Sequence, residues 1–178
     1  MRLKIYALAV MNMAVLVCII GCRDGGKPTP FKISLEAEYR KKIQEINYKT
    51  GAEQMTVSDL KKLLYAGDNL LILDVRTPEE FQIGALAGAM SLPLEKIPGF
   101  IPRLYGNKTI VSYCTVGYRS GLVAVDLENL LGRPVYNLDG GIIEWFNQGG
   151  EVIDSEGSSS SRIHPYNASW EPFIIVRE

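Results

Sequence analysis

The stretch that decides the fold is Ser112-Tyr113-Cys114-Thr115-Val116-Gly117-Tyr118-Arg119-Ser120. An apolar run from Thr109 to Tyr113 stops at its cysteine, and an amphipathic segment from Ser120 to Leu131 begins at its end. This order predicts a buried parallel strand, a tight turn and a helix. Because open parallel sheets place ligands at the carboxyl ends of their strands, we expect a functional site around Cys114.

The turn after Cys114 has the composition of an anion cradle. A helix N-terminus presents unpaired backbone N–H groups and the positive end of its dipole. Gly117 permits the positive φ that turns successive N–H groups inward, and Arg119 adds a permanent cation. We therefore expect a Cys114 thiolate to be stabilised and to act as a nucleophile at neutral pH. The single histidine, His164, lies far along the chain, which argues against a Cys-His or Ser-His-Asp enzyme.

Strand and helix patterns alternate on both sides of this stretch. Short apolar runs predict three further strands, at 70–73, 89–92 and 135–138. Helical patterns follow Ser58, which is the expected N-cap of one helix, and Pro78, and a last helix is expected at 142–148. The alternation predicts an α/β fold in which helices cover both faces of a central parallel sheet.

Four motifs resemble those of the rhodanese-like domain family of sulfurtransferases, and they follow that family's order along the chain. Cys114 to Ser120 resembles the active-site loop of that family, with an arginine five positions after the cysteine and then a serine. The other three are Leu73-Asp74-Val75-Arg76-Thr77-Pro78-Glu79-Glu80-Phe81, Gly88-Ala89-Met90-Ser91-Leu92-Pro93, and Leu138-Asp139-Gly140-Gly141 followed by Trp145. The resemblance covers about residues 55–152 and implies a rhodanese-like three-layer α/β/α fold. It departs at Ala85-Leu86-Ala87, where the family often has His-Ile-Pro.

The resemblance also implies a mechanism. The Cys114 thiolate would take the outer sulfur of thiosulfate or of a persulfide donor and pass it to a thiol or to cyanide. Arg119 would be the second catalytic residue, binding the anionic donor and stabilising the leaving sulfite. Asp74 and Arg76 would support the site by pairing with each other or with nearby backbone. No cofactor is implied, and the loop residues that would bind this small sulfur-containing anion are Thr115, Val116, Gly117, Tyr118 and Ser120.

Other functions fit the same residues. One is a sulfur carrier that passes its sulfur only to a periplasmic protein acceptor, and another is a non-catalytic interaction module. Phosphatases and arsenate reductases that resemble this fold carry a longer loop than the six residues from Cys114 to Arg119. The loop length therefore favours sulfur transfer over phosphate or arsenate chemistry.

The N-terminus has the pattern of an exported lipoprotein. A basic start precedes an apolar run from Ile5 to Ile20, and Ile19-Ile20-Gly21-Cys22 resembles the bacterial lipobox. We expect residues 1–21 to be a signal peptide and a lipid on Cys22 to anchor the protein to the cell envelope, facing the periplasm or the exterior. An uncleaved membrane helix and a plain secreted protein are the alternatives, and the apolar run is at the short end for a membrane span. Cys114 would be the one free thiol of the mature chain.

The composition argues against two further classes of function. Lys and Arg number 19 against 20 Asp and Glu, so the formal net charge is -1 and no nucleic-acid surface is expected. The three cysteines form no CxxC pair and there is one histidine, so no metal site is expected.

Four segments are expected after the signal peptide. They are a tether at 22–33, a helical extension at 34–54, the rhodanese-like domain at 55–153, and a Ser-rich linker with a C-terminal tail at 154–178. Ser34 is the expected N-cap of the extension, which is either a spacer or a helix packed on the domain. Apolar residues in the tail predict that much of it docks on the domain or on a partner.

Overall fold

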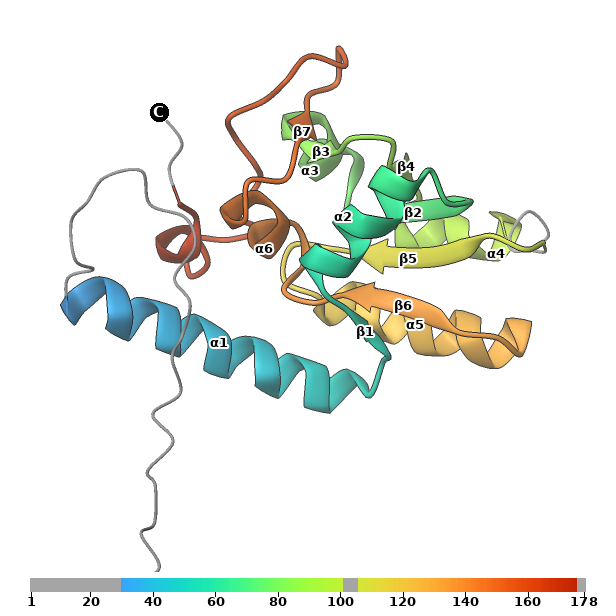
Figure 1. Ribbon diagram of the computed structural model, residues 1–178, viewed down its shortest axis with the longest axis horizontal. Coiled ribbons are helices and arrows are strands. Elements are labelled where there is room, and N and C mark those ends of the chain that lie inside the picture. The colour runs from blue at the N-terminus through green and yellow to red at the C-terminus, as the bar shows by residue number, and fades with distance from the viewer. Residues whose placement is uncertain (1–29, 101–105, 176–178) are drawn as a thin grey trace, which may run out of the picture.

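The computed structural model describes residues 30–100 and 106–175, and a five-stranded sheet lies at its centre (Figure 1). The strand order is β1-β6-β5-β2-β4, and all neighbouring strands are parallel. The strands are β1 (Gln54–Met55), β2 (Leu70–Asp74), β4 (Met90–Ser91), β5 (Thr109–Tyr113) and β6 (Val135–Leu138). A second, antiparallel sheet pairs β3 (Ala85–Leu86) with β7 (Val152–Ile153), two strands that the sequence did not predict.

Helices cover both faces of the central sheet, which confirms the predicted three-layer α/β/α fold. α2 and α6 pack in one buried apolar cluster, whereas α5 and α4 pack in a second cluster on the other face. The α-helices are α1 (Pro30–Thr50), α2 (Val57–Ala66), α3 (Pro78–Ile83), α4 (Ile97–Phe100), α5 (Tyr118–Leu131) and α6 (Gly141–Asn147). Two short 3₁₀ helices, η1 (Leu94–Lys96) and η3 (Glu171–Phe173), complete the described part of the chain.

The central strands supply side chains to both clusters. In β2, Ile72 belongs to the cluster of α2 and α6, and Leu73 belongs to the cluster of α5. In β5, Val111 belongs to the cluster of α2 and α6, and Ile110 belongs to the cluster of α5. Successive side chains of a strand point to opposite faces, so an all-apolar run is what a sheet covered on both sides requires.

The register of the strands places their carboxyl ends at one edge of the sheet. Asp74 of β2 lies opposite Tyr113 of β5, and Ser112 lies opposite Asn137 of β6. Cys114 directly follows β5, so it stands at this edge between the segments that follow β2 and β6. This is the position at which ligands bind in open parallel sheets.

Two threonine caps set where helices begin near this edge. Thr56 accepts the N–H of Asp59 at 3.1 Å and caps α2, so the predicted cap at Ser58 is wrong, because Ser58 already lies in the first helical turn. Thr77 and Glu80 form a reciprocal capping box at α3. The capping box also fixes the direction of the Glu80 carboxylate.

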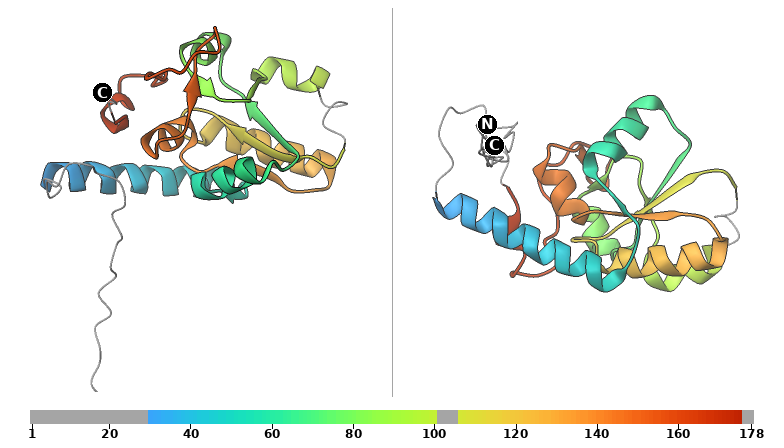
Figure 2. Two further views of the ribbon diagram at one scale, coloured as in Figure 1. Left: turned by 45° about the horizontal axis from the view of Figure 1, so that its top comes forward. Right: turned by 60° about the horizontal axis from the view of Figure 1, so that its bottom comes forward.

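The helical extension packs on the domain and is longer than predicted. α1 begins at Pro30, within the expected tether, so Ser34 is not its N-cap, and proline suits the first turn of a helix. Tyr39 and Ile43 are buried in the cluster of α2 and α6, and the Tyr39 hydroxyl donates to the Gly140 carbonyl at 3.2 Å. Figure 2 shows α1 running along the domain towards α5, with which it is in contact. In the part of the chain that the structure describes, no helix is long and apolar enough to cross a bilayer.

The C-terminal tail docks against α1 and α6, as its apolar residues predicted. Phe173 is 7% exposed, and its ring lies 5.4 Å from that of Tyr39 and 5.7 Å from that of Trp170. Asn147 of α6 holds the tail backbone, because its Nδ2 donates to the Phe173 carbonyl and its Oδ1 accepts the Ile175 N–H. The course of the tail is therefore fixed by both ring contacts and backbone hydrogen bonds.

The Ser-rich segment forms a closed turn, so the predicted loose linker is wrong. The Asp154 carboxylate accepts the N–H groups of Glu156 and Ser158, each at 2.9 Å. Ser160 then returns along β7, where its N–H donates to the Val152 carbonyl at 2.8 Å. The hydrogen bonds to the Asp154 carboxylate fix the backbone of the turn, although serine and glycine residues by themselves favour a flexible segment.

Replacing Phe173 by Ala should lower the free energy of unfolding by about 3 kcal/mol, because the change removes a buried ring between α1 and the tail. Denaturant titration followed by circular dichroism measures this difference. Ile175→Ala is the matched control, since the Ile175 side chain is 49% exposed and its loss should cost under about 0.5 kcal/mol. Equal losses in the two variants would contradict the docked position of the tail.

Candidate active site

Cys114 lies in a loop that is held from two sides. The residue is 1% exposed, and the Gly117 N–H donates to its Sγ at 3.3 Å. The start of α6 holds the loop carbonyls, because Ile142 N–H donates to the Cys114 oxygen at 2.9 Å and Ile143 N–H to the Thr115 oxygen at 3.2 Å. The sulfur therefore stands beside the first turn of α5, where backbone N–H groups stabilise negative charge.

Two glycines allow this close approach. Gly117 has φ +93°, which a residue with a side chain rarely adopts, and this conformation aims its N–H at the sulfur. Gly141 has φ +58°, and a Cβ there would lie 2.3 Å from the Cys114 carbonyl oxygen. A side chain at either position would displace the loop that carries the nucleophile.

Asn137 of β6 supports the same loop from the sheet. Its Nδ2 donates to the Gly117 carbonyl at 3.0 Å, and its Oδ1 accepts the Ser120 hydroxyl at 2.6 Å. The Ser120 hydroxyl is therefore buried against β6, and binding of a substrate by the loop amides up to Ser120 stays a prediction. α5 begins at Tyr118, two residues before the predicted start, because Gly117 with its left-handed backbone is the N-cap.

Arg119 forms a two-pronged ion pair with Glu80 of α3. Its Nη1 donates to Oε2 and its Nη2 donates to Oε1, each at 2.7 Å. Thr115 completes a triangle, since its hydroxyl accepts from Arg119 Nη2 and donates to Glu80 Oε1, each at 3.1 Å. The sequence predicted Arg119 as a cation available to an anionic donor, but Glu80 already compensates its charge.

This geometry sets the charge of both partners. Burial raises the pKa of Glu80, but hydrogen bonds from Arg119 and the Thr77 backbone, together with the Arg119 charge, lower that pKa to about 2. Burial lowers the pKa of Arg119, and its hydrogen bonds to Glu80 and the nearby Cys114 sulfur raise it above the ordinary value. Glu80 is therefore a carboxylate at neutral pH and too weak a base to take a proton from Cys114.

Asp74 and Arg76 pair with each other, as predicted, in a fully buried cluster behind the site. Arg76 donates from Nε to Asp74 Oδ1 at 2.9 Å and from Nη2 to Oδ2 at 2.6 Å, and Nη2 also donates to the Gly84 carbonyl. The Tyr113 hydroxyl donates to Asp74 Oδ2 at 2.6 Å and accepts the Leu86 N–H at 3.1 Å. The cluster ties the segment after β2 to β5 and β3, and neither charged group reaches solvent.

A pocket of about 230 Å³ opens at Cys114 and is named here the Cys114 pocket. The Cys114 loop and the start of α5 form its floor, as the sequence predicted for Thr115, Val116 and Tyr118. α1 and the tail form its remaining walls, which the sequence did not predict. The pocket is lined by Ile46, Cys114, Thr115, Val116, Tyr118, Arg119, Tyr166 and Trp170.

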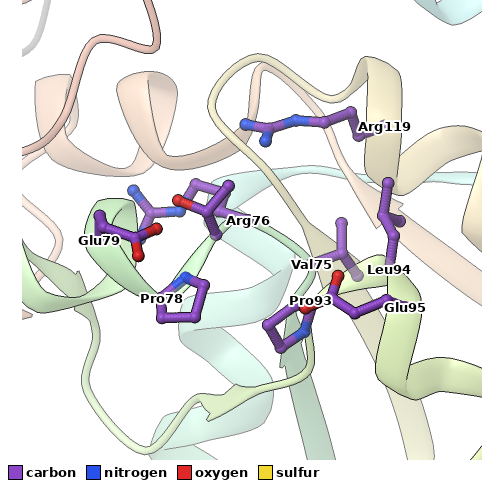
Figure 3. A pocket seen from close by; sticks show the side chains of 9 residues that line it. Val75, Arg76, Pro78, Glu79, Pro93, Leu94, Glu95 and Arg119 are labelled. Carbon is purple, nitrogen blue, oxygen red and sulfur yellow. The ribbon is translucent and has the colours of Figure 1, made fainter.

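A second hollow, of about 300 Å³, also borders Arg119 but does not include Cys114 among its lining residues. Figure 3 shows Arg119 on one side of it, with Arg76 and Glu79 on another and Glu95 across from them. The two glutamate carboxylates disfavour an anion there. Of the two hollows, the Cys114 pocket is the one that Cys114 lines.

Glu80 and Asn137 are parts of the site that the motifs did not reveal. Glu80 lies within the motif from Leu73 to Phe81, where the sequence indicates only that it belongs to the first turn of a helix. Asn137 is an amide in an otherwise apolar strand, and such a residue signals a buried hydrogen-bond role. The sequence did not indicate that Ile46, Tyr166 and Trp170 line the site, because their positions depend on how α1 and the tail dock on the domain.

Comparison with known proteins gives consistent matches. The family model of the rhodanese-like domain matches residues 56–148. A sulfurtransferase of Allochromatium vinosum is 34% identical over 98 residues, which are 55% of this chain and 92% of that protein. A tRNA uridine(34) hydroxylase of Xylella fastidiosa is 36% identical over 95 residues, but the match spans 37% of its length. A crystal structure of a rhodanese-like domain protein from Staphylococcus aureus is 31% identical with a TM-score of 0.50, covering 56% of this chain and 96% of that one.

Glu80→Gln should destabilise the protein by about 2 kcal/mol at neutral pH, because it leaves the Arg119 charge without its partner. The pKa of Glu80 is lowered in the folded state, so its contribution is present above the unfolded pKa of about 4.3 and is lost as the pH falls towards 2. Unfolding free energies of the two proteins should therefore converge between about pH 4.5 and pH 2. Glu79→Gln, at an exposed neighbour, should show a much smaller difference, and a pH-independent difference for Glu80→Gln would contradict the ion-pair explanation.

Proposed function

Because the chain belongs to the rhodanese-like domain family, we propose that it is a sulfurtransferase in which Cys114 carries sulfane sulfur as a persulfide. The observation that carries this proposal is the Cys114 sulfur in its pocket, accepting the Gly117 N–H in a loop that α6 holds in place. The similarity to a sulfurtransferase along 92% of that protein supports the same class of reaction.

The reaction has two displacement steps at sulfur. In the first, the Cys114 thiolate attacks the outer sulfur of thiosulfate or of a persulfide, an S–S bond forms, and the sulfite or thiolate leaves with the bonding electron pair. In the second, an acceptor thiolate or cyanide attacks the outer sulfur of the Cys114 persulfide and releases the thiolate of Cys114. Each step forms one bond to the transferred sulfur and breaks another, and the leaving group takes the bonding electron pair. No external electron donor or acceptor takes part, so no redox cofactor is needed.

The residues around Cys114 have separate tasks in these steps. The Gly117 N–H and the first turn of α5 stabilise the negative charge on the thiolate and on the persulfide. The Arg119 guanidinium lies near the sulfur, and Glu80 and Thr115 hold it in place.

Incubating the protein with a sulfane-sulfur donor and no acceptor should add one sulfur atom to Cys114, and a thiol reductant should remove it. Mass spectrometry of the intact protein and of its peptides detects the adduct. Cys114→Ser should form no adduct, because a serine hydroxyl keeps its proton and cannot hold a persulfide. Turnover with cyanide or a thiol would support the enzyme, whereas an adduct without turnover would point to a sulfur carrier for a periplasmic protein, and no adduct would point to an interaction module.

We further propose that a lipid on Cys22 anchors the protein to the cell envelope, with the domain facing the periplasm or the exterior. The proposal is supported by the apolar run that ends in Ile19-Ile20-Gly21-Cys22. These residues lie outside the part of the chain that the structure describes. A helical α1 that starts at Pro30 leaves only a short segment between the proposed anchor and the domain.

Cys22→Ala should leave an unprocessed precursor without lipid, because the thiol is the atom that would be acylated. Metabolic labelling with a fatty acid and the mass of the mature chain measure both effects. Cys18→Ala is the matched control and should be processed normally, since it lies within the expected signal peptide. Normal lipid labelling of the Cys22→Ala protein would overturn the assignment.

A further inference from the structure

We infer that the Cys114 pocket selects a sulfur donor with an apolar, planar organic body rather than a small inorganic anion, an inference that rests on the proposed sulfurtransferase function. The feature behind it is the set of walls that α1 and the tail add to the loop. These walls are Ile46 of α1 and Tyr166 and Trp170 of the tail. All three lie outside residues 56–148, the stretch that the family model matches.

The size and chemistry of the pocket fit such a donor. Its volume of about 230 Å³ lies just below the roughly 300 Å³ at which pockets for drug-sized ligands begin. Most of its walls are apolar or aromatic side chains, with Ile46 and Val116 aliphatic and Tyr118, Tyr166 and Trp170 aromatic. A fully hydrated inorganic anion gains nothing from such walls, whereas an aromatic ring gains by leaving water.

The charge at the pocket points the same way. Arg119 is the only charged residue among the described residues that line it. Both prongs of its guanidinium are bound to the Glu80 carboxylate, whose pKa of about 2 keeps it charged throughout the physiological range. The pair is therefore close to neutral as a unit, and it does not offer a free cation to a dianion such as thiosulfate.

The tail presents its aromatic residues to the pocket in a defined conformation. Tyr166 has φ +71° and is the one non-glycine residue with positive φ in the described part of the chain. Its N–H donates to His164 Nδ1 at 3.0 Å, and its ring lies over the Arg119 guanidinium, 4.8 Å from Cζ. Trp170 packs on Phe173, which is itself buried against α1. A strained backbone that is held at a pocket wall is typical of a functional position.

The donor reaction that follows from this pocket balances without another reagent. The Cys114 thiolate attacks the sulfane sulfur of an organic thiosulfonate, the new S–S bond forms, and the bond between the two donor sulfurs breaks. An organic sulfinate leaves with the electron pair, and its apolar group remains against Tyr166 and Trp170 until it dissociates. Benzenethiosulfonate and methanethiosulfonate are suitable probes, because they carry the same charge and the same reacting group and differ only in the body.

The test compares sulfur loading of the full chain by these two donors. Each kcat/KM is divided by the rate of the same donor with free cysteine, which removes the difference in intrinsic reactivity. The corrected preference for benzenethiosulfonate should be at least about tenfold, as expected for burying a phenyl ring. It should fall at least about fivefold in Trp170→Ala or in Tyr166→Ala. Tyr65→Ala, which removes a 96% exposed ring from α2, is the matched control and should keep the full preference.

Each outcome bears on one claim. A corrected preference near one in the native chain, or a preference unchanged in both folded pocket variants, overturns the inference and leaves sulfur transfer intact. If Trp170→Ala does not fold, Tyr166→Ala decides, because its ring is 54% exposed. If neither donor loads sulfur, the proposed function fails, and the inference is then decided by binding of benzenesulfonate and methanesulfonate, which carry no transferable sulfur. Quenching of tryptophan fluorescence should show benzenesulfonate binding at least about tenfold more tightly, and equal affinities would overturn the inference.

Discussion

The two parallel hydrogen bonds between Arg119 and Glu80 are the interaction on which the site depends. They join α3, which follows β2, to the first turn of α5, which follows β5, so two separate crossovers of the sheet are fixed to each other. Thr115 lies in the same triangle, and the Cys114 loop is thereby held at its middle. The same interaction fixes the Arg119 guanidinium in the position where the Tyr166 ring lies over it. The position of the Arg119 guanidinium thus depends on one ion pair, whose carboxylate is oriented by the capping box at Thr77.

Behind this pair, the sheet edge is stiffened by groups that never meet solvent. Asp74 and Arg76 are fully buried together, and Tyr113 connects them to the backbone of β3. Buried charges are tolerated when they are paired and hydrogen-bonded, and here Arg76 Nη2 donates to Asp74 and to the backbone carbonyl of Gly84, whereas Arg76 Nη1 has no hydrogen-bond partner among the described residues. The result is a rigid frame next to a loop whose carbonyls are bound by α6. Such a frame keeps backbone N–H groups directed at the sulfur without a cost in reorganisation.

The sequence revealed those parts of the protein in which local pattern and chemistry coincide. β2 and β5 are apolar runs because both of their faces are buried, and the cysteine, glycine and arginine after β5 mark a loop that binds negative charge. Two-residue strands such as β3 carry no periodicity, so their pairing with β7 arises only in the folded chain. The inward direction of the Ser120 hydroxyl could not be predicted for a related reason, because its partner, Asn137, is distant in sequence. The loop of the Cys114 pocket could be predicted from the sequence but its other walls could not, since Ile46, Tyr166 and Trp170 are each more than fifty residues from Cys114 in the chain.

Because the tail forms part of the wall of the Cys114 pocket, reactivity and donor selection depend on different segments of the chain. Bond making and breaking are encoded in the central stretch around Cys114, whereas the choice of what reaches the sulfur is encoded at Ile46, Tyr166 and Trp170, in segments that precede and follow the domain. Since Trp170 follows the Cys114 loop in the chain, these walls close only after the segment up to Trp170 has been made. A change at either flanking segment can therefore alter the range of molecules admitted while the Cys114 loop keeps its own residues.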